Sequence, residues 1–193
     1  EAQGRHVFFI DDDEIATEHL IETLWETFQA HQCDCVGGRI DLRPQKQMPG
    51  WLTRELWGFL GYLDYGEEVF QMDEERYPFG GNMAFSREVL HRIGLFNVDM
   101  GRSGQGLFGG AEFELFQRFL ASGGKAIYQP LAAVYHVIEP RRLRKRYFRR
   151  LHYSEGLQKA RLEDRNNDAR RLHGVPLFLF PQFTRSTVAF LRE

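Results

Sequence analysis

Cysteine is scarce in this sequence of 193 residues, which contains only Cys33 and Cys35. A disulfide framework needs more cysteines, and a tetrahedral zinc site needs further Cys or His residues at matching spacing. We therefore interpret the pair as reduced thiols on a strand, which is typical of a reducing compartment. This favours a cytoplasmic protein, with attachment to the cytoplasmic face of a membrane as an alternative.

Long apolar runs are absent as well. No run approaches the ~18 apolar residues that cross a membrane, and Glu1–Arg5 lack the basic and apolar regions of a signal peptide. Because the sequence opens without an initiator Met, we expect it to begin inside a longer natural protein. A large excess of charge is also missing, since the formal net charge of -2 argues against binding polyanions through bulk charge.

The composition that is present, 42% hydrophobic and 27% charged residues, is that of a soluble globular domain with a core. The apolar run Val7–Ile10 predicts a buried strand, parallel to its neighbours and covered on both faces. Thr17 is the predicted N-cap of a helix whose apolar residues recur at helical spacing through Phe28. Cys35–Leu42 predict the next strand, and the order strand, helix, strand indicates an α/β fold.

Residues 43–80 predict a long, partly helical excursion, and an excursion of this length is usually functional. Within it, Trp51 and Trp57 could stack on sugar rings, but packing in the core is the favoured interpretation. Ser86 predicts the cap of a short helix that stops at Gly94.

The next stretch, residues 101–110, holds five glycines and predicts a loop. A helix is predicted to follow from Glu112 to Leu120. Strand pieces on either side of Pro130 are predicted at residues 126–128 and 132–137.

The first strand ends abruptly in the acidic run Asp11-Asp12-Asp13-Glu14. In open α/β sheets ligands bind beyond the carboxyl ends of strands, and a divalent cation removes the mutual repulsion of clustered carboxylates. Oxygen ligands suit Mg²⁺ or Mn²⁺, which usually also coordinate substrate phosphates. Alternate residues of an extended segment point the same way, so Asp11 and Asp13 could share a metal. A solvated acidic loop before a helix is the competing interpretation.

Several segments together resemble family 2 glycosyltransferases of the GT-A type. Residues 8–14 resemble the DXD segment, residues 77–87 the "GxNxAxRR" segment, and residues 93–96 the "GGF" turn. Residues 110–115 with Arg118 are similar to the "GEDxEL…R" signature, and residues 127–130 and 133–136 to the last strand pair of the family's core. The resemblance covers residues 7–150 in the family's order and spacing.

This resemblance implies a GT-A-like sheet with flanking helices, without the family's N-terminal nucleobase-binding part, because six residues precede the DXD strand. It implies a nucleotide-diphosphate sugar as donor, contacted by Asp11, Asp12 and Asn82. It also implies Mn²⁺ or Mg²⁺, held by Asp11, Asp13 and His136. For Asn82 a turn residue, and for His136 a structural hydrogen-bonding role, are the competing interpretations.

The carboxylate of the "GED" segment is the family's general base, and the alignment places Glu112 at that position. Transfer to the acceptor hydroxyl then inverts the anomeric configuration. Two departures affect the expected geometry, since the family's usual base is the shorter Asp and Ala111 stands where a further acid is usual. Glu114 is the reserve candidate for the base.

The segment Arg141–Arg150 carries seven cations in ten residues. It could contact phosphate, lie on an anionic membrane or form a solvated helix, and nucleic acid is not an expected partner. We predict a partial GT-A catalytic core in residues 1–150 and a basic, aromatic, helical extension in residues 151–193. Residues 141–193 are expected to be peripheral to the chemistry and available for membrane contact.

Three functions stay open from the sequence. The favoured function is an inverting, metal-dependent glycosyltransferase that acts on a carbohydrate or lipid-linked acceptor. A metal enzyme for phosphate esters would also use Asp11 and Asp13, but would not need Glu112 behind a glycine-rich loop. A catalytically incomplete module that binds membrane or polyanion through residues 141–150 is the third.

Overall fold

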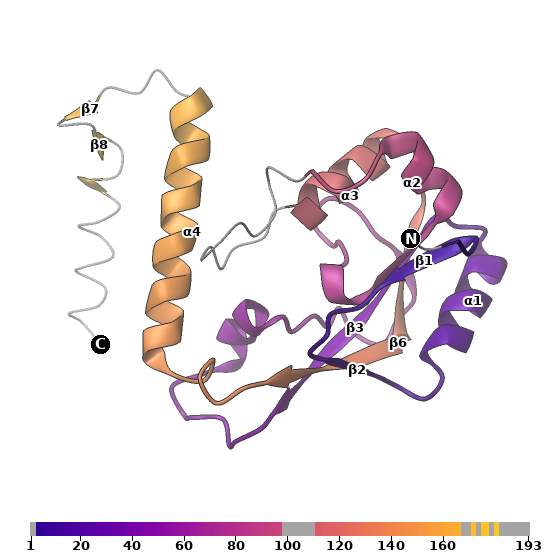
Figure 1. Cartoon of the computed structure of the whole chain (residues 1–193), viewed down its shortest axis with the longest axis horizontal. Coiled ribbons are helices and arrows are strands. Elements are labelled where there is room, and N and C mark those ends of the chain that lie inside the picture. Colours follow the sequence, from indigo (N-terminus) through magenta and orange to yellow (C-terminus); the bar gives the residue numbers. More distant parts are fainter. Residues whose placement is uncertain (1–2, 98–110, 167–170, 173–174, 178–179, 182–193) are drawn as a thin grey trace. The chain divides into compact units, whose positions relative to one another are not determined.

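The computed structural model describes residues 3–97, 111–166, 171–172, 175–177 and 180–181 (Figure 1). The predicted glycine-rich loop at residues 101–110 lies outside the described residues. The chain divides into two compact units, Glu1–His152 and Tyr153–Glu193. The sheet lies in the first unit.

A six-stranded mixed sheet is the centre of the first unit. Its strands are β1 (His6–Phe9), β2 (Glu14–Ala16), β3 (Cys35–Pro44), β4 (Phe70–Gln71), β5 (Met83–Ser86) and β6 (Ala126–Ile138). Their order is β1-β5-β3-β6-β2, and β4 also pairs with β6. The pair β3–β6 is parallel, and every other pair in this sheet is antiparallel. The α/β fold class predicted from the sequence is therefore confirmed.

Strand β1 differs from its prediction. It pairs antiparallel with β5, at the end of the strand order, and all its residues are only half-buried. Its apolar run reflects contacts on both faces, since Phe8 packs against one core cluster while Val7 and Phe9 pack against another. An uninterrupted apolar run therefore indicated two covered faces here, but it could not reveal the strand's direction or its edge position.

The two faces of the sheet are covered by different helices (Figure 1). Helix α1 (Leu20–His31) packs with one set of strand residues, including Val36 and Ile127. Helices α2 (Arg87–Ile93) and α3 (Ala111–Ala121) pack with the alternate residues, including Cys35 and Tyr128. This alternation follows the period of two along a strand. Cys33 and Cys35 are both free and buried, but Cys33 lies before β3 rather than on it.

The start of α1 was predicted incorrectly. The helix begins at Leu20, and neither Thr17 nor the N-cap residue His19 caps it with a side chain. Instead the Thr17 hydroxyl donates a hydrogen bond to the Ala133 carbonyl at 2.9 Å. The side chain fastens the connection between β2 and α1 to β6. By contrast, Ser86 caps α2 by accepting from the Val89 N–H at 3.3 Å.

Strand β6 is continuous over 13 residues and is not broken at Pro130 as predicted. The register against β3 shifts there, because Gly38 pairs with Gln129 whereas Ile40 pairs with Val134. A proline inside a sheet is tolerated at such an irregularity, since no ladder hydrogen bond needs its missing N–H.

A third core cluster lies beside the sheet, around the 3-10 helix η1 (Arg54–Leu60). Leu52, Ile138 and Phe148 are among its buried members, and Trp51 and Trp57 pack against it, as favoured from the sequence. Phe148 belongs to helix α4 (Lys145–Asn166), which starts in the first unit.

In the second unit α4 continues, and the short strands β7 (Arg171–Leu172) and β8 (Val175–Pro176) pair antiparallel. Within the described residues, no helix is both long enough and apolar enough to cross a membrane.

Candidate active site

Residues Ile10–Asp13 connect β1 to β2, which stand at opposite ends of the strand order. In a flat sheet these strands would be about 19 Å apart, whereas so short a connection reaches at most about 17 Å. The connection is further shortened by a turn, in which the Glu14 N–H donates to the Asp11 carbonyl at 3.2 Å. The sheet therefore curls, and the acidic residues lie where its two ends approach each other.

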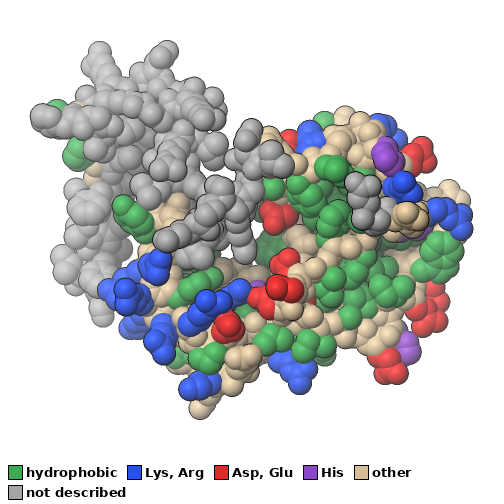
Figure 2. Space-filling model, in the orientation of Figure 1, with side chains coloured by type: hydrophobic (Ala, Val, Ile, Leu, Met, Phe, Trp, Pro, Cys, Tyr) green, Lys and Arg blue, Asp and Glu red, His purple; other side chains and the backbone are tan. Residues whose placement is uncertain are grey.

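This turn separates two hollows on the surface. One, of about 410 Å³, is lined by Asp12, Asp13, Glu14, Ile15, Gln45, Val137, Glu139, Arg141 and Arg142. The other, of about 300 Å³, is lined by Phe8, Phe9, Ile10, Asp11, Gly80, Phe96 and Glu112. Figure 2 shows acidic side chains in the middle of the drawn face with basic side chains beside them.

The segment was predicted to be extended, with Asp11 and Asp13 on the same side. That premise is wrong, because the residues form a turn, and Asp11 and Asp13 line different hollows. Shared ligation of one metal by this pair would require the turn to rearrange.

Asp13 is engaged by residues from far along the chain. Its Oδ2 accepts a hydrogen bond from Arg142 Nη2 at 2.9 Å and lies 3.3 Å from His136 Nε2. His136 Nδ1 lies 2.7 Å from the Leu60 carbonyl, which can only accept, so this nitrogen carries the proton. Nε2 is then free to accept from Arg142 Nη1 at 3.0 Å. A single guanidinium thus binds both predicted metal ligands.

Arg142 was missed as an individual residue, although contact with phosphate was one of the interpretations of the basic run that contains it. Arg141 and Arg142 line the larger hollow, so this part of residues 141–193 lies beside the acidic turn. That residues 141–193 are peripheral to the chemistry stays a prediction. The run is close to the acidic turn because β6 ends at Ile138, next to the residues that pair with β2.

Glu14 is a second residue that the sequence analysis did not single out. Its Oε2 accepts from the Asp11 N–H at 3.1 Å. Burial, and to a smaller extent the charges of Asp11 and Asp13, raise the pKa of Glu14 to about 7, although the hydrogen bond from Asp11 lowers it. Perturbed acids in surface hollows are often functional. The available signal was its position as the last of four consecutive acids after an apolar strand.

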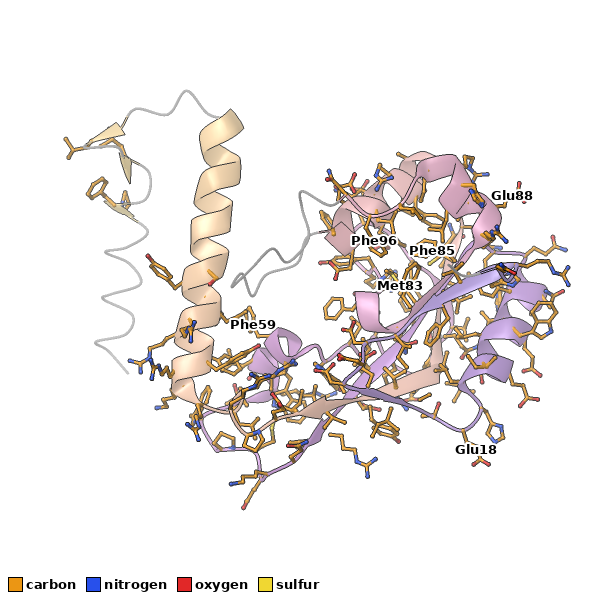
Figure 3. The ribbon with its side chains drawn as sticks, in the orientation of Figure 1. Glu18, Phe59, Met83, Phe85, Glu88 and Phe96 are labelled. Atoms are coloured by element: carbon orange, nitrogen blue, oxygen red, sulfur yellow. The ribbon has the colours of Figure 1, made fainter. Side chains whose placement is uncertain are left out.

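Glu112 lies in the first turn of α3, half-buried, in the hollow that also contains Asp11. The side chain packs directly on Gly80, where a Cβ would be 2.8 Å from Glu112 Cγ. Phe96 closes part of the same hollow, and it lies on the side of the sheet that carries Met83 and Phe85 (Figure 3). The position suits a base that acts on a group bound in this hollow, and the role itself stays a prediction.

Glu114, the alternative candidate for the base, forms an ion pair with Arg118. Both its oxygens accept from Arg118, at 2.5 Å from Nε and 2.9 Å from Nη2. Arg118 also donates to the carbonyls of Ile93 and Leu95. The pair therefore ties α3 to the turn that follows α2.

Asn82 is fully buried, in the 3-10 helix η2 (Gly80–Asn82). Its Nδ2 donates to the carbonyls of Arg39 and Ala132, both at 2.8 Å, at the register shift between β3 and β6. Both amide hydrogens are thereby used inside the protein, which favours a bracing role. The predicted contact with a donor stays a prediction.

A mixed, curled sheet with helices on both faces and a carboxylate-rich turn at its edge defines an α/β protein with a candidate ligand site at that edge. Residues 1–152 match the family described as "Glycosyltransferase like family 2", and the chain belongs to this family. Its fold is accordingly of the GT-A type.

One curated relative is the glucosyl-dolichyl phosphate glucuronosyltransferase of Haloferax volcanii, 29% identical over 137 residues. The match covers 69% of this chain and 43% of the relative, so the chain spans less than half of that protein's length. Among solved structures, "Crystal structure of GalNAc-T7 with UDP, GalNAc and Mn2+" is similar at a TM-score of 0.49 and 19% identity, over 69% of this chain and 28% of that one.

Proposed function

We propose that this chain supplies the catalytic part of a glycosyltransferase that moves a sugar from a nucleoside-diphosphate donor to an acceptor hydroxyl. The observation that carries the proposal is the shared hollow of Asp11 and Glu112, in a chain of a glycosyltransferase family. A residue of the acidic turn and a candidate base then line the same space, as transfer between two bound substrates requires.

We further propose that the reaction depends on Mn²⁺ or Mg²⁺. Such ions are usually held by one or two protein groups and completed by substrate phosphates. Within the described residues, no group of three or more His, Cys, Asp or Glu side chains is placed to hold a metal. Asp13 Oδ2 and His136 Nε2 lie 3.3 Å apart and offer two donor atoms, which is enough for an ion that substrate phosphates complete. Asp11 lies in the other hollow. When bound, the cation would offset charge on the diphosphate.

The proposed reaction inverts the anomeric centre. Glu112 accepts the proton of the acceptor hydroxyl, and the hydroxyl oxygen bonds to the anomeric carbon while the bond from that carbon to the diphosphate breaks. The nucleoside diphosphate leaves with the bonding electrons. Packing of Glu112 against Gly80 supports this role, because a base must be held in place to act within hydrogen-bond reach.

For the acceptor we propose a carbohydrate or a lipid-linked sugar. The name of the Haloferax volcanii relative supports a lipid phosphate that already bears a sugar, and a glucuronosyl donor. A cytoplasmic location is proposed from the free thiols of Cys33 and Cys35, and contact of residues 141–193 with the membrane face from their basic and aromatic composition.

The test is incubation of the full-length protein with Mn²⁺ and a panel of nucleotide sugars, and separately with bis-(p-nitrophenyl) phosphate. We expect release of nucleoside diphosphate with at least one donor and loss of this release with EDTA. The coupling constant of the anomeric proton should show that the product has the anomeric configuration opposite to that of the donor. Cleavage of the phosphodiester without any nucleotide-sugar turnover would instead support the phosphoesterase alternative.

A further inference from the structure

Two consecutive glycines in η2, Gly80 and Gly81, each face one carboxylate. A Cβ on Gly81 would lie 2.3 Å from Glu14 Oε1 and 2.5 Å from its Oε2, and a Cβ on Gly80 would lie 2.9 Å from Glu112 Oε1. Contacts this short essentially never occur for a real Cβ. Neither glycine has a positive φ, so backbone conformation does not require glycine here, whereas a Cβ at either position would displace the carboxylate that rests on it.

The backbone that carries these glycines is held firmly to the centre of the sheet. Asn82, the last residue of η2, binds carbonyls of β3 and β6 and is fully buried. The Asn82 N–H also donates to the Phe79 carbonyl at 3.1 Å. The contacts with Gly80 and Gly81 therefore fix the positions of the Glu112 and Glu14 carboxylates relative to the sheet and to each other.

Glu14 also holds the acidic turn. Its carboxylate accepts from the Asp11 N–H, while the backbone N–H of Glu14 donates to the Asp11 carbonyl. Asp11 is thus fixed by both its N–H and its carbonyl to the residue that rests on Gly81. Asp11 and Glu112 line the same hollow, so any shift of Glu14 changes the separation of the two groups.

We propose that Glu14 is a positioning residue, which sets the acidic turn Asp11–Asp13 against Gly81 at a fixed separation from Glu112 on Gly80. The inference rests on the proposed transferase function. Glu14 itself need not contact the donor, the acceptor or a metal. It acts through the Asp11 backbone. Gly81 contacts Glu14 and Gly80 contacts Glu112, so the two adjacent glycines set the distance between the acidic turn and the candidate base.

The test uses the full-length protein and compares Glu14→Ala with Glu14→Gln. The alanine variant should lower kcat about 10- to 100-fold, with a smaller change in donor KM, because small misplacements of this kind carry such losses. The glutamine variant keeps an oxygen that accepts from Asp11 and should retain most of kcat. A parental kcat in a folded Glu14→Ala protein would overturn the proposal.

The steric contact supplies a second test through a double-mutant cycle. Gly81→Ala alone should push Glu14 away and lower kcat, whereas in the Glu14→Ala background it should cost little more. Gly50→Ala is the matched control, because a Cβ there meets nothing within 4 Å. Fully additive losses in the cycle would show that Gly81 and Glu14 act independently, against the proposal.

A third readout separates this inference from the proposed function. The amide proton of Asp11, followed by NMR, should move upfield and exchange faster in Glu14→Ala but not in Glu14→Gln. If no nucleotide sugar is turned over while the Asp11 amide responds as expected, the positioning contact stands and the transferase proposal fails. An unchanged Asp11 amide in Glu14→Ala would refute the contact itself.

Discussion

The guanidinium of Arg142 lies on Asp13, with Nη2 donating to Oδ2 at 2.9 Å, and its Nη1 donates to His136 Nε2. These are donor atoms that a divalent cation would need. In this arrangement the positive charge is supplied by the protein, so a cation that binds His136 Nε2 has to displace Arg142 Nη1 and competes with Nη2 at Asp13 Oδ2. The proposed metal dependence therefore includes competition between a guanidinium and a metal.

Replacing Arg142 should strengthen metal binding in the absence of nucleotide. Displacing a hydrogen bond to a charged group costs roughly 1.5–3 kcal/mol, so Arg142→Met should bind Mn²⁺ about 10- to 100-fold more tightly. Calorimetric titration measures this directly. Arg141→Met is the matched control, because Arg141 lines the same hollow but pairs with Glu139. Equal Mn²⁺ affinity in parent and Arg142→Met would exclude the competition.

Asp13→Asn should abolish Mn²⁺ binding together with sugar transfer, because the amide keeps the size of the side chain but loses the charge that a divalent ion requires. Calorimetry with and without nucleoside diphosphate is the measurement. Glu139→Gln removes a carboxylate from the same hollow and should leave Mn²⁺ affinity close to that of the parent. Undiminished affinity in Asp13→Asn would remove Asp13 from the metal site.

Glu14 should make stability depend on pH. Its pKa is raised from 4.5 to about 7 in the folded protein, mainly by burial, so the folded state holds the proton more tightly than the unfolded chain. The stabilisation is complete below about pH 4.5 and is lost as the pH rises through 7. Between pH 4.5 and 8 the free energy of unfolding should fall by on the order of 2–3 kcal/mol more in the parent than in Glu14→Gln.

Urea titrations at both pH values give that difference. Glu26→Gln, on the exposed surface of α1, controls for removal of one carboxyl group. If the parent and Glu14→Gln show the same change in unfolding free energy with pH, Glu14 is not the group responsible.

Locally encoded features were predictable from the sequence, and contacts that depend on the curl of the sheet were not. Ser86 and Gly94 delimit α2 as expected, since a cap and a stop act within a few residues. The bond between Asp13 and Arg142 joins positions 129 residues apart. Thr17 shows the limit of local patterns, because its hydroxyl binds β6 in preference to the helix that it precedes.

The same holds for the candidate site. The acidic run and Glu112 could be recognised from residue types and motif order, and the structure places Asp11 and Glu112 in one hollow. The packing of two carboxylates on Gly80 and Gly81 is visible only in the folded chain. A sequence pattern shows that glycine is present, but not which side chain would collide with a Cβ.

Glu112 provides the most direct test of the chemistry. A base that removes the acceptor proton interacts more strongly in the transition state than with the bound substrate, so its loss should reduce kcat far more than donor affinity. Glu112→Gln should lower kcat about 10²- to 10⁴-fold, while nucleotide and Mn²⁺ affinities stay within a few-fold. Glu112→Asp restores the family's usual residue and should retain part of the activity.

Gly80→Ala should reproduce part of this loss while leaving the carboxylate chemically unchanged, because the new Cβ would lie 2.8 Å from Glu112 Cγ and displace the side chain. Gly58→Ala is its control, since a Cβ there meets nothing within 4 Å. Transfer rates and nucleotide affinity are measured in parallel on the full-length protein. If Glu112→Gln transfers sugar at the parental rate, Glu112 is only a charge at the start of a helix. Glu114 would then have to leave Arg118 to act, and Glu114→Gln would identify it by loss of kcat.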